Sequence, residues 1–94
     1  MNYLYKTERK PLRIDLSRTF IRRTDLSGAN LEGANLSYAD CKNAVFRGAN
    51  FKNTDLEGTI LKGADLSDAR NLTREQINKA IIDETTILPA YLHS

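Results

Sequence analysis

The chain has 94 residues and a formal net charge of +2, with 40% hydrophobic residues, 28% charged residues and no tryptophan, which is the size of one small domain. No apolar run approaches the roughly 20 residues that span a bilayer, and residues 1–13 lack the apolar stretch of a secretory signal, so we expect no membrane segment and a cytoplasmic location. Cys41 and His93 are the only cysteine and histidine. This excludes an internal disulfide, and we expect no bound metal or cofactor.

Residues 1–13 form the first segment, which is basic and partly aromatic. Its charged residues are Lys6, Glu8, Arg9, Lys10 and Arg13, and its apolar group is Tyr3, Leu4 and Tyr5. The segment shows no helical periodicity. It is interpreted either as an extended stretch that folds over the next element or as an arm for a partner or for self-association.

A period of five residues runs through residues 14–68. Eleven positions in this register are apolar: Leu16, Ile21, Leu26, Leu31, Leu36, Cys41, Phe46, Phe51, Leu56, Leu61 and Leu66. Two residues before each of these centres the side chain is nearly always small, and one residue before it eight of the eleven are Asp or Asn. All five glycines lie two residues after a centre, as do Asn43, Asn53 and Asp68, which are residue types that tolerate positive φ.

Neither an α-helix nor a flat strand can bury this period. On a helix, five residues advance by about 140° beyond one turn, so the centres would scatter around the axis. On a flat strand, successive centres would lie on opposite faces. A three-residue strand followed by a two-residue bend keeps the small residue and the centre on one side, and repeating that bend winds the chain into a coil with every centre inside. Both prolines, Pro11 and Pro89, lie outside the repeats, as such a ladder requires.

The units A-N-L-E-G at residues 29–33 and A-N-L-S-Y at residues 34–38 resemble the A-(D/N)-L-x-x unit of the pentapeptide-repeat family. The resemblance covers eleven tandem units over residues 14–68. It implies an all-β fold, a right-handed quadrilateral parallel β-helix with four repeats per coil. This chain would then form nearly three coils.

The residues themselves bear on whether the coil has four or three sides. With four sides, residues 20 apart stack, so Asn35 separates Asp15 from Asp55. With three sides, Asp25, Asp40 and Asp55 would stack, and like charges directly opposite are destabilising. A four-sided coil does stack three cations at another position of the repeat, but their long side chains can splay apart. The short Asp side chains cannot, so their separation favours four sides.

Residues 69–94 are expected to cap the coil. The sequence T-R-E-Q from residue 73 has the pattern of a capping box, and Leu72 and Ile77 are placed as a hydrophobic staple. This predicts a helix over residues 74–82 that lies across the coil end as a lid. The face that would be buried consists of Ile77, Ala80 and Ile81. The tail Ile87-Leu88-Pro89, part of a T-x-L-P pattern similar to ends seen in the family, is expected to complete the cover.

The pattern argues against catalysis. The Asp residues recur as a structural signature and have no nucleophile beside them, and every glycine belongs to the five-residue register rather than to a phosphate-binding loop. Cys41 occupies an inward centre, which predicts a buried, inert thiol. We therefore expect no enzymatic activity.

Departures from the repeat signature mark the outer surface instead. Phe20, Val45 and Ile60 replace Asp or Asn, and Tyr38 replaces a turn glycine. On a four-sided coil the apolar and basic departures share one side, and the candidate partner-binding residues there are Phe20, Arg22, Arg23, Lys42, Ile60 and Lys62. Such a side would suit an acidic or amphipathic protein. The alternative is that scattered surface lysines and apolar residues have no specific role.

The preferred function is a non-catalytic protein-interaction or scaffold module with an unidentified protein partner. A second copy of the chain, joined through the N-terminal end of the coil, is a further candidate partner. The alternative function is mimicry of DNA toward a type II topoisomerase, as in quinolone-resistance members of the family that this chain resembles. The repeats carry seven basic and eight acidic residues, and nearly three coils rise only about 13 Å, which suits that role poorly. Direct nucleic-acid binding has little support, since the basic residues are few and not interleaved with aromatics.

Overall fold

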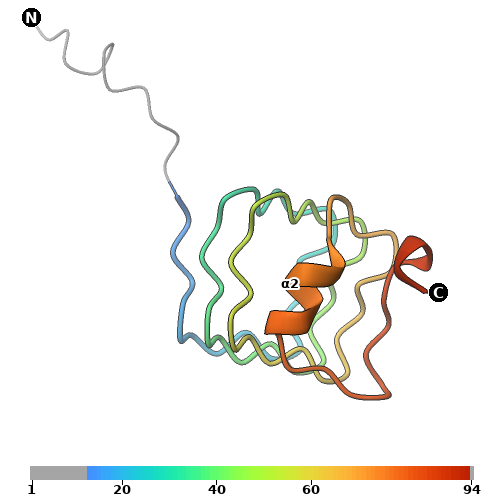
Figure 1. Ribbon diagram of the computed structural model, residues 1–94. Coiled ribbons are helices and arrows are strands. Elements are labelled where there is room, and N and C mark those ends of the chain that lie inside the picture. The colour runs from blue at the N-terminus through green and yellow to red at the C-terminus, as the bar shows by residue number, and fades with distance from the viewer. Residues whose placement is uncertain (1–12, 94) are drawn as a thin grey trace, which may run out of the picture.

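The chain winds as a coil whose successive turns stack side by side (Figure 1). The computed structural model describes residues 13–93. Within these residues the helices are α2, Arg74–Lys79, and a short 3-10 helix η1, Ala90–Leu92. The repeats are joined by isolated parallel bridges rather than by strands of several residues. The expectation of three-residue strands is therefore wrong in detail, because the bend after each centre leaves only one paired residue per side.

The bridges fall into four columns whose members lie 20 residues apart over the repeats. The columns are Asp15–Asn35–Asp55, Phe20–Asp40–Ile60–Ile81, Asp25–Val45–Asp65–Ile87 and Asn30–Asn50–Arg70. Four repeats thus complete one turn of the coil, as the separation of the Asp residues predicts. We call the residue before each centre the bridge residue.

Three backbone hydrogen bonds per repeat connect one coil to the next, two of them made by the bridge residue and one by the N–H of the residue two positions after the centre, as Tyr38 N donates to Glu57 O at 2.8 Å. The N–H of the centre Leu36 donates to the Asp55 carbonyl at 2.9 Å, and the N–H of the bridge residue Asp55 donates to the Ala34 carbonyl at 2.9 Å. Both backbone groups of a bridge residue therefore point toward the preceding coil. This direction decides what the two ends of the coil expose.

Each side ends in a corner residue, two positions after the centre, with positive φ. All five glycines occupy such corners, with φ between 65° and 73° in the left-handed region. The other corners also have positive φ: Arg18, Arg23, Tyr38, Asn43, Asn53 and Asp68. The predicted role of the Gly, Asn and Asp positions is confirmed. Arginine and tyrosine take the same conformation at a cost, because their Cβ atoms are crowded there.

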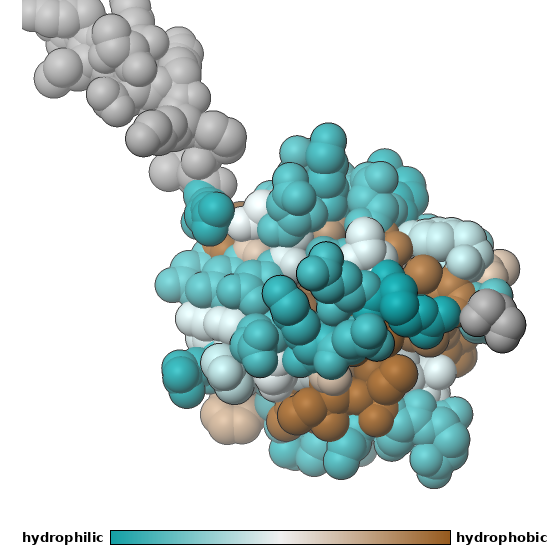
Figure 2. Space-filling view, viewed as in Figure 1, coloured by the Kyte–Doolittle hydropathy of each residue, from teal (hydrophilic) through white to brown (hydrophobic). Residues whose placement is uncertain are grey.

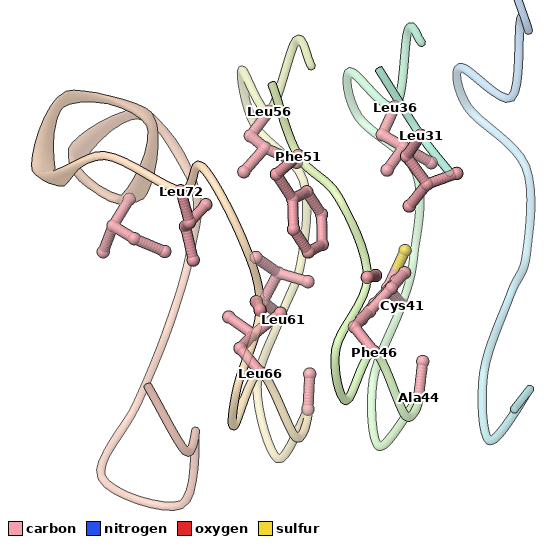
Figure 3. Packing of buried hydrophobic residues seen from close by; sticks show 14 of the residues in the cluster. Leu31, Leu36, Cys41, Ala44, Phe46, Phe51, Leu56, Leu61, Leu66 and Leu72 are labelled. Carbon is pink, nitrogen blue, oxygen red and sulfur yellow. The ribbon is translucent and has the colours of Figure 1, made fainter. Parts of the chain in front are cut away.

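The centres point into the coil and form its core (Figure 3). Leu36, Cys41 and Phe46 are completely buried, and the rings of Phe46 and Phe51 meet edge to face with centroids 5.4 Å apart. From Ala34 to Ala64 the small positions are buried too. At Thr54 and Thr59, where threonine replaces alanine in an inner coil, the hydroxyl donates to a carbonyl of the preceding coil, as Thr59 Oγ1 does to Leu36 O at 2.8 Å.

The capping box at the start of α2 is confirmed. Gln76 N donates to Thr73 Oγ1 at 3.1 Å, and Thr73 N donates to Gln76 Oε1 at 2.8 Å. The predicted end of the helix at residue 82 is wrong, since α2 ends at Lys79 and Ala80 is already extended. The reason is tertiary: Ile81 joins a bridge column of the coil by pairing with Ile60, which a helical residue could not do.

The segment after α2 continues the coil rather than lying across it. Ile81 N donates to Thr59 O at 2.8 Å, and Ile87 N donates to Ala64 O at 2.9 Å, which repeats the bond of a bridge residue. Thr86 Oγ1 donates to Leu61 O at 2.8 Å, as Thr59 Oγ1 donates to Leu36 O on another side of the coil. The pattern T-x-L-P therefore resumes the register of small residue, bridge residue and centre.

The last residues close the C-terminal end of the coil. Tyr91 OH donates to Ala69 O at 2.8 Å and accepts from Leu72 N at 3.0 Å. Leu92 is buried, and its carbonyl accepts a hydrogen bond from the Arg74 guanidinium. At the other end, both interpretations of residues 1–13 fall on residues 1–12, which lie outside the described residues.

We expect Leu36→Ala to lower the free energy of unfolding by about 2–5 kcal/mol, because the side chain is fully buried and a cavity would remain. Leu16→Ala is the matched control: the same atoms are removed from a half-buried centre of the first coil, so the loss should be smaller. Urea denaturation of both variants measures the difference. Equal losses would contradict the burial of Leu36 in the coil.

Candidate functional site

The recurring carboxylates serve the corners of the coil. Asp15, Asp25 and Asp65 each accept bonds from the backbone N–H and the hydroxyl of the serine two residues later; at Asp65 the distances are 2.9 Å and 2.6 Å. These hydrogen bonds hold the pKa values of the three carboxyls below their ordinary value. Asn residues at the same position accept the equivalent backbone bond, as Asn35 does from Ser37 N at 2.9 Å. The Asp residues are thus turn-stabilising groups.

The candidate partner-binding residues lie together on one side of the coil, which we call the Phe20 side. It consists of the bridge column Phe20–Asp40–Ile60–Ile81 and the residues that follow each centre on that side. Phe20 leaves 83% of its surface exposed, and Ile81 leaves 43% exposed. Ile60 is half-buried between its neighbours. The sequence analysis thus places Phe20 and Ile60 correctly on one side.

Asp40 separates the two predicted apolar residues and carries an ion pair. Arg22 Nε donates to Asp40 Oδ2 at 2.7 Å, and Arg22 Nη2 lies 2.6 Å from the same oxygen. The hydrogen bond from Arg22 lowers the pKa of the Asp40 carboxyl, and the same bond raises the pKa of the Arg22 guanidinium. One of the predicted cations is therefore already partnered within the chain.

The cations of the Phe20 side form a second column. Arg23 N donates to Lys42 O at 3.0 Å, and Asn43 N donates to Lys62 O at 3.0 Å, so Lys42 and Lys62 occupy equivalent positions in successive coils. Asp83 follows them in the last coil. The pKa of the Asp83 carboxyl is lowered mainly by hydrogen bonds from Thr85, and the charge of Lys62 lowers it further.

Sequence reasoning missed three members of this side: Asp40, Ile81 and Asp83. Asp40 lies 20 residues from both Phe20 and Ile60, so the four-sided register already contained the signal. Ile81 and Asp83 could not be found in this way, since the pattern assigned Ile81 to a helix.

Two corners bound the Phe20 side. At one of them the Arg18 guanidinium carbon lies 4.9 Å from the centroid of the Tyr38 ring, a cation–π distance. The ring covers Gly58, where an added Cβ would come within 2.4 Å of it. Arg23 occupies the other corner and is exposed. An exposed aromatic group and a cation therefore border the side.

Hydrophobic side chains also gather over the chain that follows α2, where Figure 2 shows a brown patch below the helix. The exposed large hydrophobic residues after α2 are Ile81, Ile82, Ile87 and Tyr91. The apolar surface of the Phe20 side thus continues onto the last coil.

A sequence model of pentapeptide repeats matches residues 24–63 and 39–70, with eight copies of the unit. These matches cover the same five-residue register that forms the stacked coils. The chain belongs to the pentapeptide-repeat family.

Two solved structures of the family are similar to this pentapeptide-repeat protein. The protein Rfr23 from the cyanobacterium Cyanothece 51142 is 24% identical, with 84% of this chain and 67% of that chain covered and a TM-score of 0.43. A pentapeptide repeat protein from Nostoc Pcc 7120 is 23% identical, with 92% of this chain and 79% of that chain covered and a TM-score of 0.32. The comparison with curated proteins gives no match.

The pentapeptide-repeat coil holds its one thiol inside. Cys41 is fully buried, and desolvation raises the pKa of the thiol to about 12, with a smaller effect of the Asp40 charge. The thiolate is therefore suppressed at neutral pH. Within residues 13–93, no three of the His, Cys, Asp and Glu side chains are grouped to hold a metal ion. Over the same residues, every helix is too short or too polar to cross a membrane.

A groove of about 820 Å³ lies between α2 and the neighbouring side of the coil. Its rim carries both signs of charge, from Lys52, Asp55, Glu57, Glu75 and Lys79. The hydroxyls in its lining are engaged: Thr54 Oγ1 donates to Leu31 O, and Thr73 Oγ1 belongs to the capping box. Gln76 Nε2 binds two carbonyls of the coil, at 2.8 and 2.9 Å, and so fixes α2 there. The periodicity gave no sign of this groove, because it depends on where α2 packs.

We expect the stability of the protein to fall on acidification. A carboxyl whose pKa is lower in the folded state stabilises the fold above its unfolded pKa, near 3.8, and this contribution is lost as the pH falls. Asp40→Asn should therefore reduce stability at pH 7 and flatten the decline below about pH 5. The effect should be small, because the Arg22 side chain is 54% exposed and solvent screens the ion pair.

Urea denaturation across this pH range measures the decline. Arg22→Gln removes the same ion pair from the other partner and should flatten the profile to a similar extent. If Arg22→Gln left the profile of the wild type unchanged, the ion pair would not be the source of the effect.

Proposed function

We propose that this pentapeptide-repeat protein is a non-catalytic module that binds another protein through the Phe20 side. The observation that carries the proposal is the exposure of Phe20, which leaves 83% of its surface in water beside a column of cations. An exposed aromatic flanked by positive charge is the composition of a protein-binding surface rather than of an ordinary outer wall. A cytoplasmic location is part of the proposal and is supported by a single cysteine, which cannot form an internal disulfide.

Arg23 gives independent support. It adopts φ of 56° at a corner where the next coils have Asn43 and Gly63. A long cationic side chain in the left-handed region is disfavoured, and such departures often persist where they serve a function. The strained corner thus adds a cation to the Phe20 side.

The charges of this side indicate the chemistry of the partner. Among residues 13–93, the ion pairs are Arg22 with Asp40 and Arg47 with Asp65 and Asp68. Arg23, Lys42 and Lys62 take no part in them. An acidic, amphipathic segment would place its apolar face on Phe20 and Ile60 and its carboxylates on these three cations.

The right-handed four-sided β-helix of the family suits this role, since a rigid coil presents flat outer walls. Mimicry of DNA finds no comparable support. The described coils expose basic side chains on the Phe20 side, whereas a mimic of DNA requires a continuous acidic surface.

The test is Arg23→Glu combined with Lys42→Glu, which reverses two charges of the Phe20 side and leaves the Arg22–Asp40 pair in place. A synthetic helical peptide with glutamates on one face and leucines on the other serves as the probe, and calorimetric titration measures its binding. We expect the affinity to fall about tenfold or more at low salt.

The control is Lys52→Glu combined with Lys79→Glu, which makes the same change in net charge beside α2. This control should bind the peptide nearly as the wild type does, and both double variants should keep the melting temperature of the wild type. If both double variants weakened peptide binding equally, the effect would be due to net charge alone, and the proposed binding side would be refuted.

A further inference from the structure

The N-terminal end of the coil presents a row of backbone groups without partners among residues 13–93. Each bridge residue directs its N–H and its carbonyl toward the preceding coil: Asn35 N donates to Ile14 O at 2.8 Å, and Asn35 O accepts from Leu16 N at 2.8 Å. The first four bridge residues have no preceding coil within the described chain. They are Asp15, Phe20, Asp25 and Asn30. An edge of this kind is a template for pairing with another strand.

The core is also less covered at this end. Leu16 and Leu26 are only half-buried, and Ile14 leaves 43% of its surface exposed. The corresponding residues of the inner coils, such as Leu36 and Phe46, are completely buried. The end therefore combines apolar surface with donors and acceptors that have no partner among the described residues.

The chain's own sequence does not continue the repeat past Ile14. In the five-residue register the next two centres would be Pro11 and Lys6. Proline has no N–H, whereas every centre of the first two coils donates one to a bridge residue of the next coil, as Leu16 does. Lysine would place a charge on the dry axis of the coil. The five-residue register therefore disfavours a further coil made by the chain itself.

The C-terminal end cannot be that complement. Tyr91 and Leu92 close it, with hydrogen bonds from Tyr91 to the last coil and from Arg74 to the Leu92 carbonyl. Head-to-tail stacking of copies, which would extend without limit, is therefore blocked. Two N-terminal ends can still meet about a two-fold axis, which gives a closed dimer.

A two-fold axis perpendicular to the coil makes the facing edges antiparallel. In an antiparallel pair, a residue that directs both backbone groups at its partner exchanges both hydrogen bonds with the residue opposite. The four bridge residues of each copy have this orientation. Four square sides can therefore form eight hydrogen bonds across the interface.

The charges decide the register of the two ends. A four-sided end can meet its copy in four ways about such an axis. Two of them place Asp15 or Asp25 opposite an aspartate of the other copy. The other two pair every aspartate with Phe20 or with Asn30 of the partner subunit, and these avoid like charges in contact.

We propose that the protein forms a two-fold dimer through the N-terminal end of the coil, with Asp15, Phe20, Asp25 and Asn30 pairing in one of the two registers that keep the aspartates apart. The dimer does not depend on the proposed binding of a protein to the Phe20 side. Its occupant is a second copy of this chain, chosen because the edge is complementary to itself and the opposite end is closed.

The test is Asn30→Asp in the full chain. In every one of the four registers this change puts at least two pairs of aspartates in contact, so we expect the dimer to dissociate about tenfold more readily. The fold should persist, because the roles of Asn30 as acceptor from Glu32 N and from Asn50 Nδ2 can be filled by a carboxylate. Asn50→Asp is the matched control, with the same change in the same column one coil inside the end.

Sedimentation equilibrium over a concentration series measures the dimer, whose mass is twice the 10.6 kDa of the chain. We expect dimers for the wild type and for Asn50→Asp, and weakened dimers for Asn30→Asp. A monomeric wild type at 100 μM, or a dimer indifferent to Asn30→Asp, overturns the proposal.

Hydrogen exchange identifies any other occupant of the edge. The amides of Phe20 and Asn30 should become protected as the dimer forms. Protection of these amides in a monomeric sample would show that the chain's own residues 1–12 cover the edge, which also overturns the proposal. Peptide binding to the Phe20 side is measured separately, so failure of one proposal leaves the other testable.

Discussion

The structure depends on one constraint: every fifth side chain must reach a shared dry axis. This is possible only if the chain turns after each centre, and each turn requires a residue with positive φ. Glycine and asparagine meet that requirement at little cost. The stacking of Leu36, Phe46 and Phe51 in turn brings bridge residues 20 apart into hydrogen-bonding distance. The buried core, the corners with positive φ and the hydrogen bonds between coils are therefore all consequences of the five-residue spacing.

The same constraint moves all chemistry to the outside. The axis is filled by apolar side chains, and Cys41, the one reactive group placed there, has its thiolate suppressed by burial. The aspartates of the repeats are occupied by the corners that they stabilise. The exposed side chains form columns on the four walls, in which neighbours come from positions 20 apart in sequence.

The Phe20 side shows how such a wall acquires its character. A single ion pair, Arg22 with Asp40, lies between Phe20 and Ile60 and divides the apolar surface. Lys42 and Lys62 follow in their own column, and Ile81 extends the wall into the last coil.

The two ends of the coil also differ from each other. Tyr91 and Leu92 finish the ladder at one end, whereas four bridge residues leave it open within the described chain at the other.

The sequence alone identified the core and favoured four sides for the coil. Periodicity identified the inward position of Leu36 and Cys41, and the spacing of the aspartates favoured four repeats per coil, because both depend only on residues related by a fixed interval. It also located Phe20 and Ile60 on one wall, for the same reason.

Tertiary structure decided the rest. The helix pattern that begins at Thr73 continues past Lys79 in the sequence, but Ile81 gains a place in the ladder opposite Ile60 and leaves the helix. The groove beside α2 and the charge interaction of Lys62 with Asp83 depend on that same exit. A repeat in the sequence shows only how residues are spaced along the chain. Where the helix ends depends on a competition between helix propensity and pairing with the unpaired edge of the last coil, and that edge exists only in the folded structure.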